Sequence, residues 1–231
     1  MKPSQFHLNK QAHNWLAYRM LDDFLESRRG YFKGALYDMG CGEAPFKEWF
    51  LRSADSYTGV DWAASAHDVK ADIIADLNKE LPIRGEAADT ITALSVLEHL
   101  CEPGTFLKES HRVLKRNGHM LISVPFQWWE HEAPHDYYRY TSRGLRYALE
   151  KAGFEVVEIL PQGGFFTMWF LKFNYFTLRF VRGPRPVRSV LRFLGGLVWH
   201  ADQLAAPLLD KLDGYPALET CGFYAVARKK A

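Results

Sequence analysis

The first residues in the chain that suggest chemistry surround two glycines near its start. An apolar run at residues 35–37 leads into Asp38, Gly40 and Gly42. Glycine lets the backbone turn sharply and approach a ligand without a Cβ in the way, and doubly wound α/β folds bind nucleotides where such a strand ends. A second apolar run ends in Asp61, about twenty residues later, where a carboxylate can accept hydrogen bonds from ribose hydroxyls. This pattern predicts a site for a cofactor that contains a nucleoside.

Two cofactor classes use such a turn, and the residues beside the glycines favour one of them. A dinucleotide site requires a third glycine three residues after the second, and Pro45 stands there instead. S-adenosylmethionine carries no phosphate but has a cationic sulfonium and an amino group, which the acidic Asp38 suits better. An NAD-dependent oxidoreductase is therefore disfavoured. A tight strand-to-helix turn without a ligand is the structural alternative.

Five motifs in the correct order make the chain resemble the class I S-adenosylmethionine-dependent methyltransferases. They are Asp38-x-Gly40-Cys41-Gly42, the acidic Asp61, Ala75-Asp76-Leu77, the segment DTITALSVLEHL at 89–100, and the turn RVLKRNG at 112–118. The resemblance covers residues 34–160 and 222–228. It implies an α/β, doubly wound, seven-stranded and mostly parallel Rossmann-like sheet with a helical insertion before the last strand. One departure is Ala44, where many members have a third glycine.

The resemblance also implies which positions would hold S-adenosylmethionine. By the motifs, the methionine part, the ribose, the adenine and the amino acid end would be contacted by Asp38, Gly40, Cys41, Gly42, Asp61, Trp62, Asp76, Leu77, Ala93 and Leu94. Two of these have simpler explanations. Asp76 could be a surface acid after an edge strand, and Leu94 could serve only in core packing.

Methyl transfer is an in-line displacement, so orientation supplies much of the acceleration, and a hydroxyl acceptor needs a base for its proton. The segment PHDYYRYT at 134–141 resembles a stretch in many small bacterial-type methyltransferases, some of which are associated with glycan or lipid-linked acceptors. In it His135 could be a base oriented by Asp136. The alternative is that Asp136 pairs with Arg139 to make the loop rigid. Glu98 and His99 are further catalytic candidates, or they orient the loop or the cofactor.

A zinc-protease pattern, His-Glu-x-x-His, occurs at 131–135 but is not expected to bind zinc. That site needs both histidines one turn apart on a continuous helix, and Pro134 lies within the turn, where it breaks helical hydrogen bonding. No third ligand follows at helical spacing. No metal is therefore expected.

The elements that must position these residues alternate along the chain. Helical spacing of apolar residues spans much of the first thirty positions, with Gly30 as its stop, and helices are also expected from Pro103 to Asn117-Gly118 and after Thr141. Seven short apolar runs read as strands, at 35–39, 57–61, 71–75, 90–94, 119–124, 154–160 and 223–227. Strands alternating with helices predict βαβ units.

The gap between the last two strands is too long for a loop and is predicted to hold two or three helices, broken at Gly183-Pro184 and Gly195-Gly196. The stretch from 161 to 201 contains no Asp or Glu but holds six of the 29 Lys and Arg residues, which leaves 23 cations against 27 acidic residues elsewhere. Ten aromatic residues are interleaved with these cations between 165 and 199. The cations at 172 and 179 interrupt any membrane-spanning run.

Three partners are compatible with this basic and aromatic insertion. It could be a helical cap that forms the acceptor pocket or a face between subunits of a homo-oligomer. It could also lie in a membrane interface, with its arginines at anionic headgroups. Nucleic acid is disfavoured, because the rest of the chain is acidic.

Composition and length limit the number of domains and the cellular compartment that can be expected. The 231 residues, with 48% hydrophobic and 24% charged, suit one globular methyltransferase domain over 1–231. Its predicted parts are a helical segment at 1–33, a cofactor-binding core at 34–160, the insertion at 161–220 and the last strand and tail at 221–231. Three scattered cysteines and the absence of an N-terminal signal pattern predict a cytoplasmic protein, membrane-peripheral if the insertion meets lipid.

The sequence thus predicts a methyltransferase that uses S-adenosylmethionine on a small-molecule, glycan or lipid-linked acceptor, at oxygen. The alternative from another class is a non-catalytic protein that keeps the fold and binds the cofactor without turnover.

Overall fold

The computed structural model describes residues 8–62, 69–214 and 218–230. Its centre is a seven-stranded sheet in the order β3-β2-β1-β4-β5-β7-β6. The strands are β1 (Ala35–Met39), β2 (Ser56–Asp61), β3 (Ile73–Ile74), β4 (Ala88–Leu94), β5 (Leu114–Pro125), β6 (Phe154–Pro161) and β7 (Gly222–Lys229). The first five in chain order are parallel, whereas β7 runs antiparallel to both β5 and β6. The predicted fold class is confirmed.

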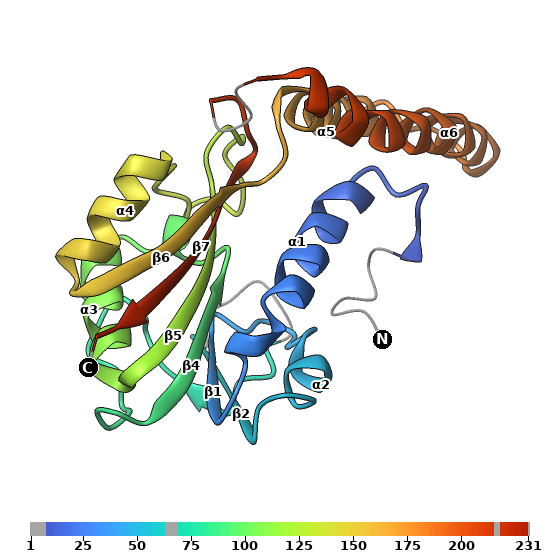
Figure 1. Ribbon diagram of the computed structural model, residues 1–231. Helices are drawn as coiled ribbons and strands as arrows, with labels where there is room; N and C mark the ends of the chain where they lie inside the picture. The colour runs from blue at the N-terminus through green and yellow to red at the C-terminus, as the bar shows by residue number, and fades with distance from the viewer. Residues whose placement is uncertain (1–7, 63–68, 215–217, 231) are drawn as a thin grey trace.

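Helices cover both faces of the sheet (Figure 1). They are α1 (Trp15–Ser27), α2 (Lys47–Phe50), α3 (Pro103–Val113), α4 (Ser142–Lys151), α5 (Phe165–Leu178) and α6 (Arg185–Leu209). Alternate residues of a strand point to opposite faces. Accordingly Met120 and Ile122 pack in the core with α3 and α4, while Leu121 between them packs in the core with α1 and α2.

Helices α5 and α6 lie beyond the carboxyl ends of the parallel strands, because α5 follows the end of β6 and α6 leads back to the start of β7 (Figure 1). They pack against each other and against the start of α1, where Trp15 and Leu16 share a core cluster with Met168 and Leu171. The Gln203 side chain of α6 joins the two regions: its Oε1 accepts the Leu16 N–H at 2.9 Å, and its Nε2 donates to the Ala12 carbonyl at 2.9 Å. No helix in the described ranges has both the length and the apolar character needed to span a membrane.

Some predicted boundaries differ from the structure. The predicted helix break at Gly195-Gly196 is wrong, because α6 continues through it; a Cβ on Gly196 would lie 3.3 Å from Gln11, so the glycine permits close packing there. The helix before β5 ends at Val113 rather than at Asn117-Gly118, and Asn117 instead adopts φ +60° within β5. Strand β3 is shorter than predicted.

Candidate active site

The turn after β1 has the backbone conformation that its glycines allow. Gly40 and Gly42 have φ values of +71° and +51°, a region that L side chains rarely adopt. A Cβ on Gly40 would lie 2.5 Å from Cγ2 of Val96, whereas a Cβ on Gly42 would meet no atom of the described residues within 4 Å. The Gly40 N–H donates to the carbonyl of Val60 at 2.7 Å. The turn therefore lies across the end of β2 and leaves open space beside Gly42 for a ligand.

Asp61 joins this turn to the end of the second strand. Its side chain is only 8% exposed. Its Oδ2 accepts the Gly42 N–H at 2.7 Å and its Oδ1 accepts the Trp62 N–H at 2.8 Å. A carboxylate has about four lone-pair positions, so each oxygen can also accept a ribose hydroxyl. The predicted role of Asp61 fits this geometry.

Asp38 lies beneath the turn and is held from two neighbouring strands. Its Oδ1 accepts the Thr92 hydroxyl at 2.6 Å and its Oδ2 accepts the Tyr57 hydroxyl at 2.8 Å. Burial raises the pKa of this carboxyl to about 6. No motif points to Tyr57 or Thr92, but Thr92 stands opposite Asp38 in the β1–β4 register, which is a signal that strand pairing provides. Direct contact of Asp38 with a cofactor stays a prediction.

The other predicted cofactor residues lie along the same edge or just below it. Cys41 is buried, and burial raises the pKa of its thiol to about 12, so it is not a reactive thiolate. Asp76 accepts hydrogen bonds from Asn78 through the backbone and the side-chain amide, both at 3.0 Å, and these and the nearby Lys79 lower its pKa. Leu77 and Ala93 are buried, and Leu94 and Trp62 are half-buried.

These residues fit an adenosyl cofactor. The glycine turn, Asp61 and Asp76 follow β1, β2 and β3, which are adjacent parallel strands. Their carboxyl ends meet at one edge, where doubly wound folds bind ligands.

The loop after β5 is built around a buried ion pair rather than around the predicted pair of His135 and Asp136. The Asp136 carboxylate is 1% exposed. It accepts hydrogen bonds from both terminal nitrogens of Arg139, each at 2.6 Å, and from the His131 backbone N–H at 2.7 Å. Chiefly through the hydrogen bonds from Arg139, the pKa of Asp136 falls to about 2. The structure does not join His135 to Asp136: His135 is exposed, and its Nδ1 lies 3.2 Å from the Tyr137 hydroxyl.

The predicted base nevertheless lies beside the predicted cofactor wall. The His135 ring meets the Trp62 ring edge-on, with centroids 5.0 Å apart. The loop is also fixed to the turn after β4, because the Tyr137 and Tyr138 N–H groups donate to the Glu98 carbonyl at 2.7 and 3.3 Å. His135 is therefore held at the cofactor edge of the sheet.

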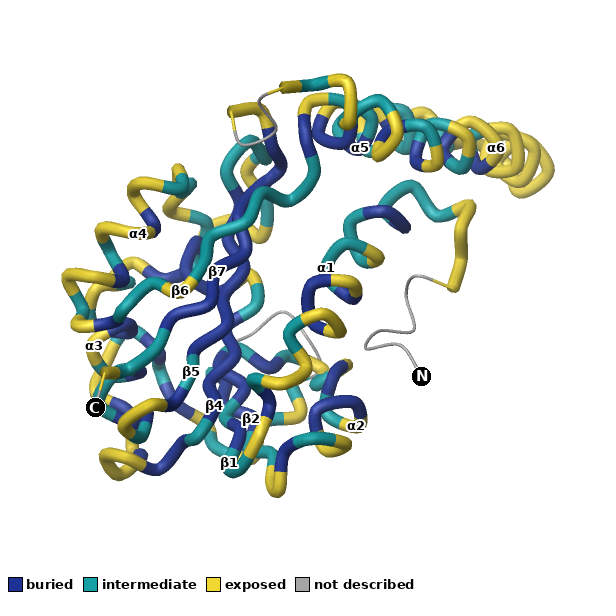
Figure 2. The backbone as a smooth tube through the Cα atoms, viewed as in Figure 1, coloured by how far each residue is buried: buried dark blue, intermediate teal, exposed yellow. Residues whose placement is uncertain are grey.

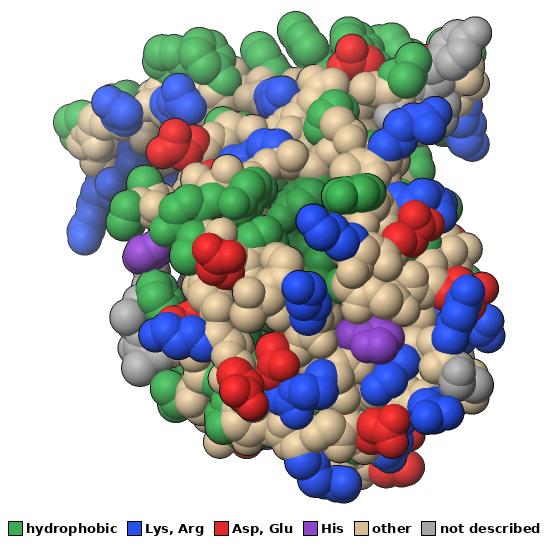
Figure 3. Space-filling view, turned by 90° about the vertical axis from the view of Figure 1, so that its left-hand side faces the viewer, with side chains coloured by type: hydrophobic (Ala, Val, Ile, Leu, Met, Phe, Trp, Pro, Cys, Tyr) green, Lys and Arg blue, Asp and Glu red, His purple; other side chains and the backbone are tan. Residues whose placement is uncertain are grey.

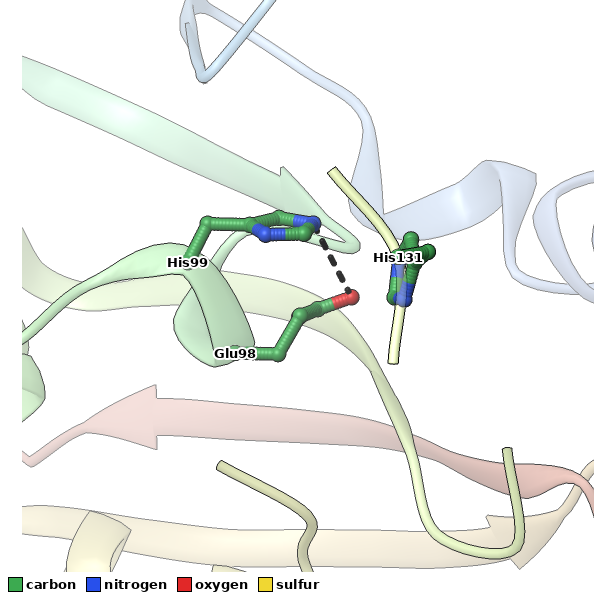
Figure 4. Close-up of side chains that lie close together, drawn as sticks. All are labelled: Glu98, His99 and His131. Atoms are coloured by element: carbon green, nitrogen blue, oxygen red, sulfur yellow. Dashed lines mark ion pairs between the residues drawn. The ribbon is translucent and has the colours of Figure 1, made fainter. Parts of the chain in front are cut away.

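Glu98 and His99 lie in that turn, a short helix at Leu97–His99, and His131 of the loop joins them (Figure 4). Glu98 is 1% exposed, and burial raises the pKa of its carboxyl to about 8. The His99 and His131 rings meet edge-on with centroids 4.9 Å apart. His131 stands more than thirty residues from the other two, so no spacing in the sequence indicates this cluster.

Comparison with known families now identifies the fold and its cofactor. The family described as "Methyltransferase domain" matches residues 19–159, which is more than half of the chain. The chain belongs to this family. The predictions of a class I methyltransferase and of S-adenosylmethionine as its cofactor are confirmed.

The methyltransferase domain is also similar to curated proteins over part of its length. It is 32% identical over 99 residues to a ubiquinone biosynthesis O-methyltransferase of Azorhizobium caulinodans, covering 38% of this chain and 39% of that protein. With the same enzyme of Pseudomonas paraeruginosa it shares 25% identity over 116 residues, covering 44% and 49% of the two chains. The match thus spans less than half of these relatives.

Solved structures share the arrangement of the methyltransferase domain. An S-adenosylmethionine-dependent methyltransferase from Mesorhizobium loti has a TM-score of 0.55 at 17% identity, with 94% of this chain and 98% of that chain covered. The 1,6-didemethyltoxoflavin-N1-methyltransferase of Burkholderia thailandensis, solved with S-adenosylhomocysteine, has a TM-score of 0.56 at 18% identity, with 93% and 79% covered. The [4+2]-cyclase SpnF has a TM-score of 0.56 at 19% identity, with 93% and 81% covered. At such identities the likeness concerns the fold.

Proposed function

We propose that the protein transfers a methyl group from S-adenosylmethionine to an oxygen of a hydrophobic or lipid-linked acceptor at a membrane surface. The use of S-adenosylmethionine is supported by the glycine turn, which is joined to Asp61 by a hydrogen bond and has open space beside Gly42. Bound there, S-adenosylmethionine supplies an electrophilic methyl group. Transfer to oxygen is supported by the curated relatives, whose names describe O-methyltransferases.

His135 is the residue best placed to take the proton of the acceptor hydroxyl. It is exposed and stands against Trp62, while its Nδ1 faces Tyr137, so its Nε2 is the nitrogen left for an acceptor. Asp136 is engaged by Arg139 and is a poor base, because its pKa is about 2. In this proposal Asp136 and Arg139 are positioning residues that hold the loop.

The class of acceptor is inferred from an aromatic stripe on α5. Its exposed members are spaced three or four residues apart and so share one face of the helix: Phe165, Trp169, Phe173 and Phe176, and the exposed Phe180 follows two residues after the helix ends. Trp169, Phe176 and Phe180 are 52%, 52% and 62% exposed. Exposed apolar patches of this kind mark interaction sites.

The loop that carries His135 packs against a different face of α5 from the exposed stripe. Tyr175 of α5 packs against Trp129, with ring centroids 4.4 Å apart, and against Trp128 at 5.5 Å. This contact holds α5 against the loop, so an acceptor bound at α5 would lie beside the loop that carries His135.

Cations accompany the apolar surface of the helix pair. Exposed arginines stand at Arg179, Arg182, Arg185, Arg188 and Arg192. The outer end of α6 is exposed all round (Figure 2), and hydrophobic side chains line the top of the molecule with Lys and Arg among them (Figure 3). Aromatic residues in the acyl boundary and arginines at anionic headgroups are the arrangement of interfacial helices. The partner that we propose for the surface of α5 and α6 is an anionic bilayer.

Two experiments test the two halves separately. Calorimetry with S-adenosylmethionine tests the cofactor site, and absence of binding would overturn it. For the acceptor, the protein and a tritiated methyl donor are incubated with lipid extracts. Label in an organic-soluble, base-stable product is expected, whereas binding of the cofactor without any labelled product would favour the non-catalytic alternative.

Flotation with vesicles tests the membrane surface. Vesicles containing phosphatidylglycerol should carry the wild-type protein at low salt, and the double variant Trp169→Ser with Phe176→Ser should remain unbound. Tyr147→Ser on α4 is the matched control, since Tyr147 is 65% exposed but lies outside α5 and α6. Equal flotation of wild type and the double variant would refute this surface.

A further inference from the structure

Glu98, His99 and His131 bring three metal-binding atoms together at the cofactor edge. One ligand atom from each lies within 4.8 Å of the others. Two of the residues come from the turn after β4 and one from the loop after β5 (Figure 4). The sequence led us to expect no metal, because Pro134 interrupts its zinc-protease pattern at 131–135 and no third ligand follows at helical spacing. In the structure His131 is grouped with Glu98 and His99 instead.

The ring hydrogen bonds of both histidines leave one nitrogen of each free to bind a cation. His99 Nδ1 lies 2.6 Å from the His135 carbonyl oxygen, which only an N–H can donate to. His131 Nδ1 lies 3.2 Å from the Asp136 carboxylate and 3.3 Å from the Trp129 carbonyl. His131 Nδ1 also lies 3.5 Å from Nη2 of Arg139, a longer contact than those to Asp136 and Trp129. Assigning the Nδ1–H tautomer to both rings, with the His131 N–H directed at these two oxygens, leaves each Nε2 with its lone pair. Metal-bound histidines are oriented by such bonds to a carbonyl or carboxylate.

The buried carboxylate of Glu98 supplies an independent observation. Glu98 is 1% exposed, and its Oε2 has no hydrogen-bond partner among the described residues. Its Oε1 is 3.9 Å from His99 Nε2, too far for a hydrogen bond. A buried polar atom without a partner is costly. A cation between this carboxylate and the two imidazoles would give it one.

Nearby charges do not oppose a cation here. The Arg139 guanidinium is the adjacent positive group, and its charge is paired with Asp136 through two contacts of 2.6 Å. A further carboxylate oxygen, Oε2 of Glu132, lies 3.9 Å from His99 Nε2 on the exposed side of the cluster.

We propose that Glu98, His99 and His131 form a binding site for a divalent transition-metal ion. Two imidazoles and one carboxylate suit Zn²⁺, Mn²⁺, Fe²⁺ or Co²⁺ and leave open positions, whereas Mg²⁺ and Ca²⁺ prefer oxygen ligands alone. Ligands about 2.1 Å from one ion stand about 3–3.5 Å apart. The ligand atoms must therefore approach by an ångström or so, which small side-chain rotations supply.

A role of this ion in catalysis rests on the proposed function, whereas binding of the ion to the three side chains does not. An acceptor hydroxyl in an open position of the ion would be acidified and oriented. Its proton passes to His135, and its oxygen bonds to the methyl carbon as the carbon–sulfur bond breaks with the electron pair on sulfur. The acceptor would then be one whose hydroxyl can bind a metal.

Titration with Co²⁺ tests the site on the full chain. After treatment with a chelator and dialysis, the protein should bind one equivalent of Co²⁺ and show visible d–d absorption, and Zn²⁺ should displace it. Glu98→Gln and His131→Ala should each weaken Co²⁺ binding at least a hundredfold. His135→Ala should retain Co²⁺ binding, because His135 meets the cluster only through its carbonyl, and so should His200→Ala on α6.

The outcomes separate the two proposals. No Co²⁺ or Zn²⁺ uptake, or uptake unchanged in both Glu98→Gln and His131→Ala, overturns the metal site. Circular dichroism of each variant shows whether it is folded, and the conservative Glu98→Gln keeps the side-chain size. Calorimetry with S-adenosylmethionine on the same samples reports on the proposed function alone, so either can fail while the other stands.

Discussion

Replacing Asp61 by asparagine should weaken cofactor binding more than any other single change at the turn. The carboxylate accepts two backbone N–H groups, from Gly42 at 2.7 Å and from Trp62 at 2.8 Å, while it is available to the ribose. An asparagine of the same size has one acceptor oxygen. Its amide nitrogen must then face an N–H group or a ribose hydroxyl that needs an acceptor.

The size of the effect follows from the bonds that are lost. A hydrogen bond to a charged group contributes about 1.5–3 kcal/mol, so losing one to the ribose should raise the dissociation constant by about 10- to 150-fold. Isothermal titration with S-adenosylhomocysteine measures this constant without turnover. Thermal unfolding of the same samples shows how much the turn itself has been destabilised.

Asp89→Asn is the matched control for this measurement. Asp89 also accepts a backbone N–H, that of Ala35 at 2.9 Å, and it pairs with Lys115, but it lies at the amino ends of the strands. Its replacement should lower stability and leave the dissociation constant unchanged. If Asp61→Asn bound the cofactor within threefold of wild type, the assignment of Asp61 to the ribose would be refuted.

Three further predictions concern stability. Ala44 has φ +52°, so Ala44→Gly should raise the free energy of unfolding by about 0.5–1 kcal/mol in urea titrations. The Asp210 carboxylate accepts the first N–H groups of α5, including that of Phe166 at 2.8 Å; Asp210→Ala should lower the free energy of unfolding by about 1–2 kcal/mol. Asp38 has a native pKa of about 6 against 3.8 unperturbed. The proton that it binds stabilises the native state below pH 4, and this stabilisation is lost as the pH rises through 6. The unfolding free energy of wild type relative to Asp38→Asn should therefore fall by about 2 kcal/mol between pH 4 and 7.

Each of these has an outcome that contradicts it. A destabilised Ala44→Gly would mean that the turn tolerates alanine without strain. Asp23→Ala serves beside Asp210→Ala, since Asp23 makes only an exposed pair with Arg19 at 3.5 Å and should change stability by less than about 0.5 kcal/mol. A pH-independent difference between wild type and Asp38→Asn would show that the pKa of Asp38 is the same in the native and the unfolded state.

The sheet could be predicted from the sequence because its signals are local. Apolar runs end in Asp38 and Asp61, and Gly40 and Gly42 stand where the backbone needs φ above zero. The mostly parallel sheet and the cofactor class followed from motifs that lie within a few residues of those ends, whereas the order of the strands in the sheet was not predicted. The predicted break at Gly195-Gly196 was wrong: α6 continues, and Gly196 lies where Gln11, far away in the chain, packs closely against the helix.

The acceptor part of the site was harder to predict from the sequence, because its signals are not local. The pairing of His135 with Asp136 was inferred from adjacency, but the Asp136 side chain faces Arg139, three residues on. His131 reaches Glu98 only because β4 and β5 are neighbours and their following segments converge. Convergence of segments depends on the tertiary fold, and no spacing within one segment encodes it.

The hydrogen bonds of Gln203 have a consequence for how the molecule would sit on a bilayer. They attach the carboxyl-terminal part of α6 to Ala12 and Leu16, at the beginning of the helix that covers the sheet. The surface that would touch lipid is thus attached to the sheet at a second point, besides its covalent connections to β6 and β7. Adsorption of the helix pair would therefore set the tilt of the whole domain, so that the opening beside Gly42 keeps a constant height and angle above the headgroups. The depth from which an acceptor must project would be a fixed property of the protein, selecting acceptors by where their hydroxyl lies along the membrane normal.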